Sequence, residues 1–148
     1  MTEKKKAKIL FLCTGNACRS QMAEGWGRHL YGDRFDVYSA GIEKHGLNAR
    51  AVQVMAEAGV DISQHRSRLI GELPVKQFDL VITVCGHAHE QCPVFPGRGP
   101  VIHHGFDDPP QLAATAAGEE EALAPYRRVR DEIRDFVRRL PDLLGEIR

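Results

Sequence analysis

Short apolar runs alternate with amphipathic helical patterns through most of the chain, and this order limits the folds open to it. The runs that predict strands lie at 7–12, 35–40, 78–84 and 99–106. The patterns that predict helices lie at 20–31, 48–58 and 119–140. Strands that alternate with helices pair in parallel and are covered on both faces. We therefore expect an α/β fold of three αβα layers around a central four-stranded parallel sheet.

Several residues define where the predicted helices begin, end and face the core. Asn48 is a plausible N-cap, and Gly59 would end the same helix as its C-cap. The last helix should turn one apolar stripe inward, made of Tyr126, Val129, Ile133, Val137 and Leu140. We interpret the alanine-rich stretch at 112–118 as a surface connection.

Composition indicates a cytoplasmic domain with no general affinity for polyanions. A chain of 148 residues with 43% hydrophobic residues has the size of one domain, here 1–148. Its 20 Lys and Arg balance 20 Asp and Glu, so net charge predicts no nucleic-acid or membrane partner. No apolar stretch approaches the ~18 residues that would span a bilayer. In a reducing compartment, the four cysteines are expected to be catalytic, redox-active or metal-bound rather than a disulfide framework.

The residues from Cys13 to Ser20 read Cys-Thr-Gly-Asn-Ala-Cys-Arg-Ser and connect the first strand to the first helix. A tight loop before a helix N-terminus directs several backbone N–H groups at one point and so forms an anion cradle. The planar fork of Arg19 suits two oxygens of a tetrahedral oxyanion. The same field would lower the pKa of Cys13 below the usual value of about 8.5, and Ser20 could donate its hydroxyl to the thiolate. A buried cysteine followed by a solvated arginine is the structural alternative.

The pattern Cys13-x5-Arg19-Ser20 after a strand resembles the phosphate-binding loop of low-molecular-weight protein tyrosine phosphatases. The string from Cys13 to Trp26 resembles the arsenate reductases built on that fold, as do Tyr38-Ser-Ala-Gly-Ile, Gly105-Phe-Asp-Asp-Pro and Arg128-Val-Arg-Asp-Glu-Ile. The resemblance covers nearly the whole chain and implies a low-molecular-weight phosphatase-like fold. It also implies that the loop binds the substrate oxyanion, through Thr14, Gly15, Asn16, Ala17, Cys18 and Arg19.

Cys85 and Cys92 are not needed by a phosphatase, and their residues alone leave several interpretations open. With His87 and His89 they could form a zinc site, although the usual Cys-x2-4-Cys spacing is absent, and they could also be inert surface thiols. We expect no metal and no cofactor. In the arsenate reductases that the chain resembles, the equivalent pair is a redox relay.

Carried over to this chain, the resemblance implies a reaction sequence. Cys13 attacks arsenate held by Arg19, and Cys85 then attacks Cys13, which releases arsenite and leaves a Cys13–Cys85 disulfide. Cys92 next attacks Cys85, and the resulting disulfide is reduced by an external dithiol protein, for which we expect thioredoxin. Phosphate or sulfate would compete with arsenate at the loop, and we expect a monomer.

By pattern alone, Asp-Asp-Pro-Pro is a plain turn sequence. The resemblance implies that Asp108 is the general acid, with Asp107 as the alternative. Phosphatases of this fold usually carry tyrosines after the Asp-Pro pair. Here Pro110 and Gln111 follow, which disfavours phosphotyrosine as the main substrate. The alternative functions are a low-molecular-weight phosphatase for phosphate monoesters and a non-catalytic thiol sensor that binds arsenite.

Three expectations concern neighbouring features. Cys18 is not required by the relay and should have a packing role. Some reductases of the family bind potassium at positions that match Asn16, Glu24 and Ser39. Because Arg68 stands where those relatives place an acid, we predict no specific potassium site here.

If 86–91 is helical in the reduced protein, the flanking cysteines lie about 10 Å apart along the axis. A disulfide tolerates only about 4.4–6.8 Å between Cα atoms, so this segment must rearrange on oxidation.

Overall fold

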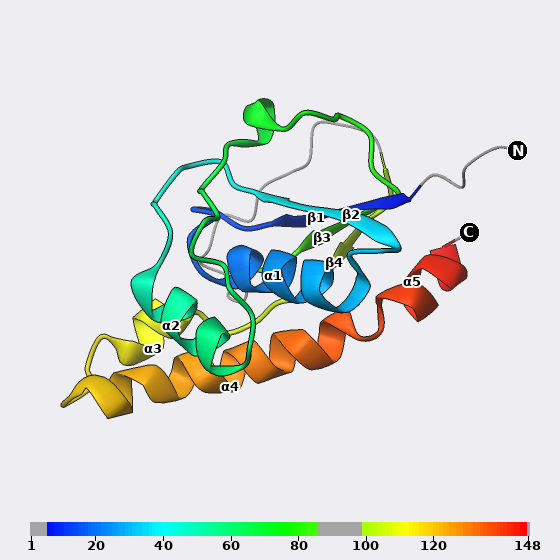
Figure 1. Cartoon of the computed structure of the whole chain (residues 1–148). Coiled ribbons are helices and arrows are strands. Elements are labelled where there is room, and N and C mark those ends of the chain that lie inside the picture. The colour runs from blue at the N-terminus through cyan, green and yellow to red at the C-terminus, as the bar shows by residue number, and fades with distance from the viewer. Residues whose placement is uncertain (1–5, 86–98, 148) are drawn as a thin grey trace, which may run out of the picture.

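The computed structural model describes residues 6–85 and 99–147, and within them four strands form one parallel sheet. The strands are β1 (Ala7–Leu12), β2 (Phe35–Ala40), β3 (Leu80–Thr83) and β4 (Val101–His103). Their order across the sheet is β2-β1-β3-β4, so β1 is flanked on both sides, with Ile9 opposite Val37 and Leu80 (Figure 1). The predicted four-stranded parallel sheet is confirmed.

The helices are α1 (Arg19–Tyr31), α2 (Ala49–Glu57), α3 (Pro109–Ala113), α4 (Glu119–Val137) and α5 (Leu140–Ile147), with a short 3-10 helix η1 (Ile70–Glu72). In Figure 1, α1, α2 and α4 lie together on one side of the sheet, and η1 lies on the other. Side chains of β1 alternate between these layers, because successive residues of a strand point to opposite faces. Ile9 and Phe11 join the core under the helices, whereas Leu10 and Leu12 pack with residues of the η1 side.

Several sequence-based boundaries need correction. The predicted strands at 78–84 and 99–106 shorten to β3 and β4. The predicted helix over 119–140 ends at Val137, and α5 begins at Leu140. Pro141 explains the break, because it has no N–H to donate to the carbonyl of Val137 and its ring would clash there. The connection predicted at 112–118 starts inside a helix, α3, which has Pro109 in its first turn.

The predicted N-cap of α2 and the predicted inner stripe of the last helical segment are confirmed, whereas the C-cap of α2 is Ala58 and not Gly59, which follows it. The amide of Ala51 donates to the Asn48 side chain over 3.0 Å, so Asn48 is the N-cap of α2. Gly59 follows the last turn of α2 with a φ of +85°, a conformation that favours glycine. All five residues predicted to face the core are at most 1% exposed: Tyr126, Val129, Ile133, Val137 and Leu140.

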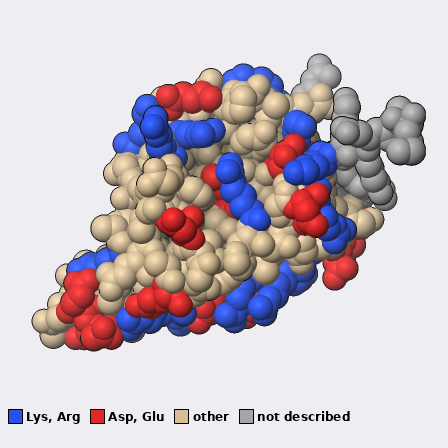
Figure 2. Space-filling model, in the orientation of Figure 1, with Lys and Arg blue, Asp and Glu red and all other residues tan. Residues whose placement is uncertain are grey.

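On the face that Figure 2 shows, basic and acidic side chains intermix, most clearly along α4. Arg127 pairs with Glu57 over 2.8 Å, and Arg128 pairs with Asp107 over 2.9 Å. The outer face of α4 is therefore a network of ion pairs rather than a uniformly basic surface. Among residues 6–85 and 99–147, no helix has both the length and the apolar composition to cross a membrane.

Candidate active site

The carboxyl ends of β1 and β3 bring three chain segments to one edge of the sheet. The amide of Val84 donates to the Leu12 carbonyl over 3.0 Å, so the chain beyond β3 stays beside the chain that leads to Cys13. The amide of Phe106 in turn donates to the Val84 carbonyl over 3.2 Å and fixes the segment that carries Asp108. Cys13 and Cys85 therefore begin loops at neighbouring strand ends, and both are buried in one core cluster.

A cavity of about 440 Å3 opens above the loop between β1 and α1. Five of the six residues predicted to bind substrate contribute to its wall: Thr14, Gly15, Ala17, Cys18 and Arg19. Cys13 and Asp108 line the same cavity. The structure thus brings together the predicted nucleophile, the predicted guanidinium clamp and the predicted acid around one space.

Asn16, the sixth residue, lies under the loop and holds its shape. Its φ of +48° is in the left-handed region, which asparagine tolerates better than most residues. The side-chain amide donates to the hydroxyls of Ser20 and Ser39, each over 2.9 Å. The side-chain oxygen accepts from the amide of Arg68 over 2.8 Å. Because Ser20 accepts a bond from Asn16, its own hydroxyl proton can still be donated to another group.

Arg19 crosses from the first turn of α1 to the segment after β4. Its side chain is 5% exposed, and its Nη1 donates to the Phe106 carbonyl over 2.9 Å. Nη2 lies 3.8 Å from the Asp108 carboxylate. Asp107, the alternative acid, instead forms its ion pair with Arg128 on α4 and does not line the cavity. Of the two aspartates, Asp108 is the one that faces the cavity.

The second cysteine of the loop has a different electrostatic setting. Burial, with a smaller contribution from the Asp108 carboxylate, raises the pKa of the Cys18 thiol far above its usual range. Cys18 therefore remains a protonated thiol at neutral pH, which fits the packing role expected from the sequence. Cys92, His87 and His89 lie outside the described residues, as does the whole segment 86–91 that was predicted to rearrange.

Two residues of the cavity wall, His45 and Pro110, were not predicted as site residues. The amide of His45 donates to the Gly15 carbonyl over 3.0 Å, and its ring Nε2 contacts the Glu43 carboxylate over 2.5 Å. A Cβ on Gly15 would lie only 2.1 Å from the His45 ring, so glycine is required for this close approach. The signal was the position of His45 just after the second predicted strand, at the same edge of the sheet.

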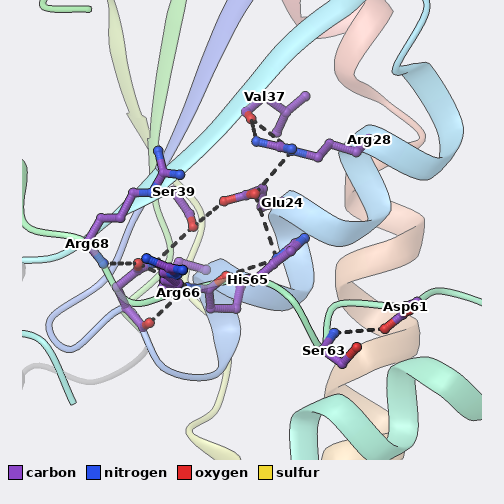
Figure 3. Close-up of polar contacts among 12 residues, drawn as sticks. Glu24, Arg28, Val37, Ser39, Asp61, Ser63, His65, Arg66 and Arg68 are labelled. Atoms are coloured by element: carbon purple, nitrogen blue, oxygen red, sulfur yellow. Dashed lines mark hydrogen bonds and ion pairs between the residues drawn. The ribbon is translucent and has the colours of Figure 1, made fainter. Parts of the chain in front are cut away.

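Below the loop, a polar cluster connects α1 to the segment at 65–68, as Figure 3 shows. Glu24 accepts a 2.6 Å hydrogen bond from Ser39 and pairs with Arg28 over 3.1 Å. His65 lies 3.7 Å from Glu24, and burial lowers the pKa of its imidazole. Within the described part of the chain, every buried side-chain nitrogen and oxygen atom has a hydrogen-bond partner. The same part contains no cluster of three or more His, Cys, Asp or Glu side chains able to hold a metal ion.

Comparison with known proteins identifies the group to which this site belongs. Residues 8–146 match the family described as low molecular weight phosphotyrosine protein phosphatase. A protein of Halalkalibacterium halodurans named arsenate reductase is 54% identical over 128 residues, which are 86% of this chain and 90% of that protein. The Bacillus subtilis protein of the same name is 53% identical over 125 residues, which are 84% and 88% of the two chains.

Solved structures agree with these sequence matches. The structure of an arsenate reductase from Archaeoglobus fulgidus superposes with a TM-score of 0.72 at 30% identity, covering 93% of this chain and 98% of the other. A low molecular weight protein tyrosine phosphatase from T. tengcongensis superposes with a TM-score of 0.67 at 26% identity, covering 93% and 99%. The chain belongs to the low molecular weight phosphotyrosine protein phosphatase family.

Proposed function

We propose that this protein is an arsenate reductase that works through a thiol–disulfide relay. The observation that carries the proposal is the convergence at one sheet edge: Cys13, Arg19 and Asp108 surround one cavity, and Cys85 follows the neighbouring strand. A phosphatase of this fold has no use for a second cysteine at that strand end. Relatives that are about half identical to this chain carry the name arsenate reductase, which supports the same activity here.

The first step is an attack of the Cys13 thiolate on arsenic. Arg19 and the loop amides hold three arsenate oxygens, and the sulfur forms a bond to arsenic opposite the departing oxygen. The As–O bond breaks, and Asp108 supplies the proton with which that oxygen leaves as water. Arsenic remains in its pentavalent state in this adduct, so no electron pair has yet been transferred to it.

The second step reduces arsenic. The Cys85 thiolate attacks the Cys13 sulfur and forms the Cys13–Cys85 disulfide. The electron pair of the S–As bond moves to arsenic, which leaves as trivalent arsenite. Two thiols have then been oxidised for one arsenate reduced, so the electrons balance.

The third step restores the nucleophile. Cys92 attacks Cys85, expels the Cys13 thiolate and leaves a Cys85–Cys92 disulfide. A thioredoxin-type dithiol then reduces this disulfide by two further exchanges. In this proposal the enzyme is a single-domain monomer of the cytoplasm, where such reductants are maintained.

A coupled assay tests the proposal. Purified reduced protein receives arsenate, thioredoxin, thioredoxin reductase and NADPH, and a parallel reaction contains glutaredoxin and glutathione instead. We expect NADPH oxidation that depends on arsenate and on thioredoxin. If arsenate causes no NADPH oxidation with either donor system, although the same preparation hydrolyses p-nitrophenyl phosphate, the reductase is refuted and the phosphatase is favoured.

Hydrolysis of small phosphate esters is the second candidate, and the family match favours it. The anion cavity does not distinguish phosphate from arsenate by geometry, so we expect weak phosphatase activity beside the reductase. Pro110 lines the cavity at the position after the Asp-Pro pair. An aromatic substrate would need an aromatic side chain there to stack on, and proline does not provide one. We therefore expect p-nitrophenyl phosphate to be hydrolysed slowly and phosphotyrosine peptides to gain nothing over it.

A further inference from the structure

We propose that this protein binds a second tetrahedral oxyanion, such as sulfate or phosphate, in a basic pocket beside α1. This pocket is lined by Glu24, Arg28, Gln64, His65, Arg66 and Arg68 and has a volume of about 190 Å3. It is separate from the cavity above the loop and shares no residue with it. The inference does not depend on the reductase activity.

Charge identifies the kind of ligand. Three guanidinium groups line the pocket against a single carboxylate, that of Glu24. The charge of Glu24 is already balanced by Arg28, whose Nε lies 3.1 Å from the Glu24 carboxylate. Arg28 also donates a hydrogen bond to the Val37 carbonyl. Within the described residues, the guanidinium groups of Arg66 and Arg68 form neither a hydrogen bond nor an ion pair. The positive charge left over therefore matches a dianion.

His65 adds no charge to this balance near neutral pH. Burial lowers its pKa, and the nearby Arg28 and Arg68 act in the same direction, whereas Glu24 and Asp61 oppose them. The single N–H of the neutral imidazole is on Nδ1, because Nδ1 lies 3.1 Å from the side-chain oxygen of Gln21 and donates to it. The other ring nitrogen then carries no proton and cannot donate, so the donors for an oxyanion are the guanidinium groups of Arg66 and Arg68.

The size of the pocket favours a small anion. Sites for drug-sized ligands and cofactors usually have volumes of about 300–1,000 Å3, whereas this pocket has about 190 Å3. Figure 3 shows the side chains of Arg28, His65, Arg66 and Arg68 arranged around Glu24, and Figure 2 shows basic side chains over α1 in the middle of that face. A compact anion with oxygens on all sides fits such an arrangement, because each guanidinium fork can take its own pair of oxygens.

The pocket is connected to the active-site loop by hydrogen bonds of its own backbone. The amide of Arg68 donates to the Asn16 side chain over 2.8 Å, and the hydroxyl of Ser67 donates to the Asn16 carbonyl over 2.8 Å. The carbonyl of Arg66 accepts from Gln21 over 2.9 Å. An anion held between Arg66 and Arg68 would fix this segment and so stabilise the loop that Asn16 shapes.

Equilibrium dialysis with radiolabelled sulfate tests the proposal, because sulfate is not a substrate. The ionic strength is kept low and constant, since exposed charges are screened by salt. We expect two sulfates per wild-type chain, one at the loop and one in the basic pocket. The double variant Arg66→Gln/Arg68→Gln should bind one, and wild-type protein carboxymethylated at Cys13 should also bind one.

The matched control is Arg50→Gln/Arg127→Gln, which removes the same charge from arginines already paired with Glu119 and Glu57. It should still bind two sulfates. One sulfate per wild-type chain, lost on carboxymethylation and unchanged in Arg66→Gln/Arg68→Gln, would overturn the proposal. So would equal loss in the control variant, because the effect would then be one of net charge alone.

A second readout measures the link to the loop in carboxymethylated protein, where the first site is blocked. Hydrogen exchange at the Arg68 amide should slow when sulfate replaces chloride at equal ionic strength. The same exchange in Arg66→Gln/Arg68→Gln should not respond to sulfate. An equal response of both proteins would show a general salt effect and contradict a bound ion.

Discussion

The two anion pockets of this protein use arginine in opposite ways. In the cavity above the loop, Arg19 is 4% exposed and is fixed by the Phe106 carbonyl and by Asp108. In the basic pocket beside α1, Arg66 and Arg68 are exposed, and only their backbone groups are hydrogen-bonded within the described residues. One guanidinium is oriented before any ligand arrives, and the other two must be ordered by the ligand.

This difference predicts different energetics for the two sites. A buried, preorganised donor loses little side-chain entropy when it binds and acts in a low dielectric, so its removal is costly. Exposed arginines lose rotamer freedom on binding and are screened by salt, so each contributes little alone. The catalytic pocket should thus respond sharply to single substitutions, and the basic pocket only to double ones.

The largest expected effect comes from Cys13→Ser. Because arsenate reduction and phosphate-ester hydrolysis use the same nucleophile, both should fall by at least about 10^4-fold. Circular dichroism and thermal melting establish that the variant is folded. Loss of one activity without the other would mean that the two reactions use different nucleophiles.

Cys85→Ser and Cys92→Ser should separate the two activities. Each variant should lose multiple turnovers of arsenate with thioredoxin and keep wild-type hydrolysis of p-nitrophenyl phosphate. Cys18→Ala is the matched control, since Cys18 is buried near the same site but has no relay role, and it should retain most of both activities. A Cys85→Ser or Cys92→Ser variant that cycles at the wild-type rate would refute the three-cysteine relay.

Arg19→Lys tests the preorganised side of the comparison. Lysine keeps the charge but cannot bind two oxygens in one plane or reach the Phe106 carbonyl with a second donor, so kcat/KM for arsenate should fall about 10^2-fold. The pair Arg66→Lys/Arg68→Lys should change kcat/KM less than about threefold at 0.15 M salt. If the exposed pair proves as sensitive as Arg19, the contrast between the pockets is wrong.

The two cysteines of the loop should differ in reactivity toward iodoacetamide at neutral pH. Burial raises the pKa of Cys18, so its thiolate fraction is negligible until the pH is far above neutral. Peptide mapping after brief alkylation at pH 7 should therefore find Cys13 labelled and Cys18 unlabelled. Labelling of Cys18 at a similar rate would show that the loop opens in solution.

The smallest expected effect is the pH dependence contributed by His65. Because burial lowers its pKa in the folded protein, the unfolded chain takes up this proton first as the pH falls below about 6.5. Stability from the neutral imidazole is complete above that pH and is lost on acidification. Urea unfolding in chloride buffer measures the free energy of unfolding at pH 7.5 and at pH 5.5. Between these two pH values it should fall less for His65→Gln than for wild type. The exposed-residue control, His29→Gln, should behave like wild type.

The sequence predicted the sheet and most of the residues that line the cavity above the loop, because both depend on local signals. Apolar runs identify the strands, and the parallel arrangement brings the loop at Cys13 and the segment at Asp108 to one edge. Residues 138–140 show what local reading missed, since the apolar stripe ran on to Leu140, whereas α4 ends at Val137, four residues before Pro141. His45 and the pair Arg66 and Arg68 were missed for another reason. Their roles depend on packing against Gly15 and Asn16, which are distant in the sequence.

A single-turnover reaction tests the central claim most directly. Fully reduced protein is mixed with excess arsenate in the absence of any external reductant, and arsenite and remaining thiols are counted. We predict one arsenite released and two thiols lost per chain, with peptide mapping finding a Cys85–Cys92 disulfide in wild type and a Cys13–Cys85 disulfide in Cys92→Ser. Arsenite formation without thiol loss, or thiols that remain fully reduced with no arsenite formed, would contradict the account.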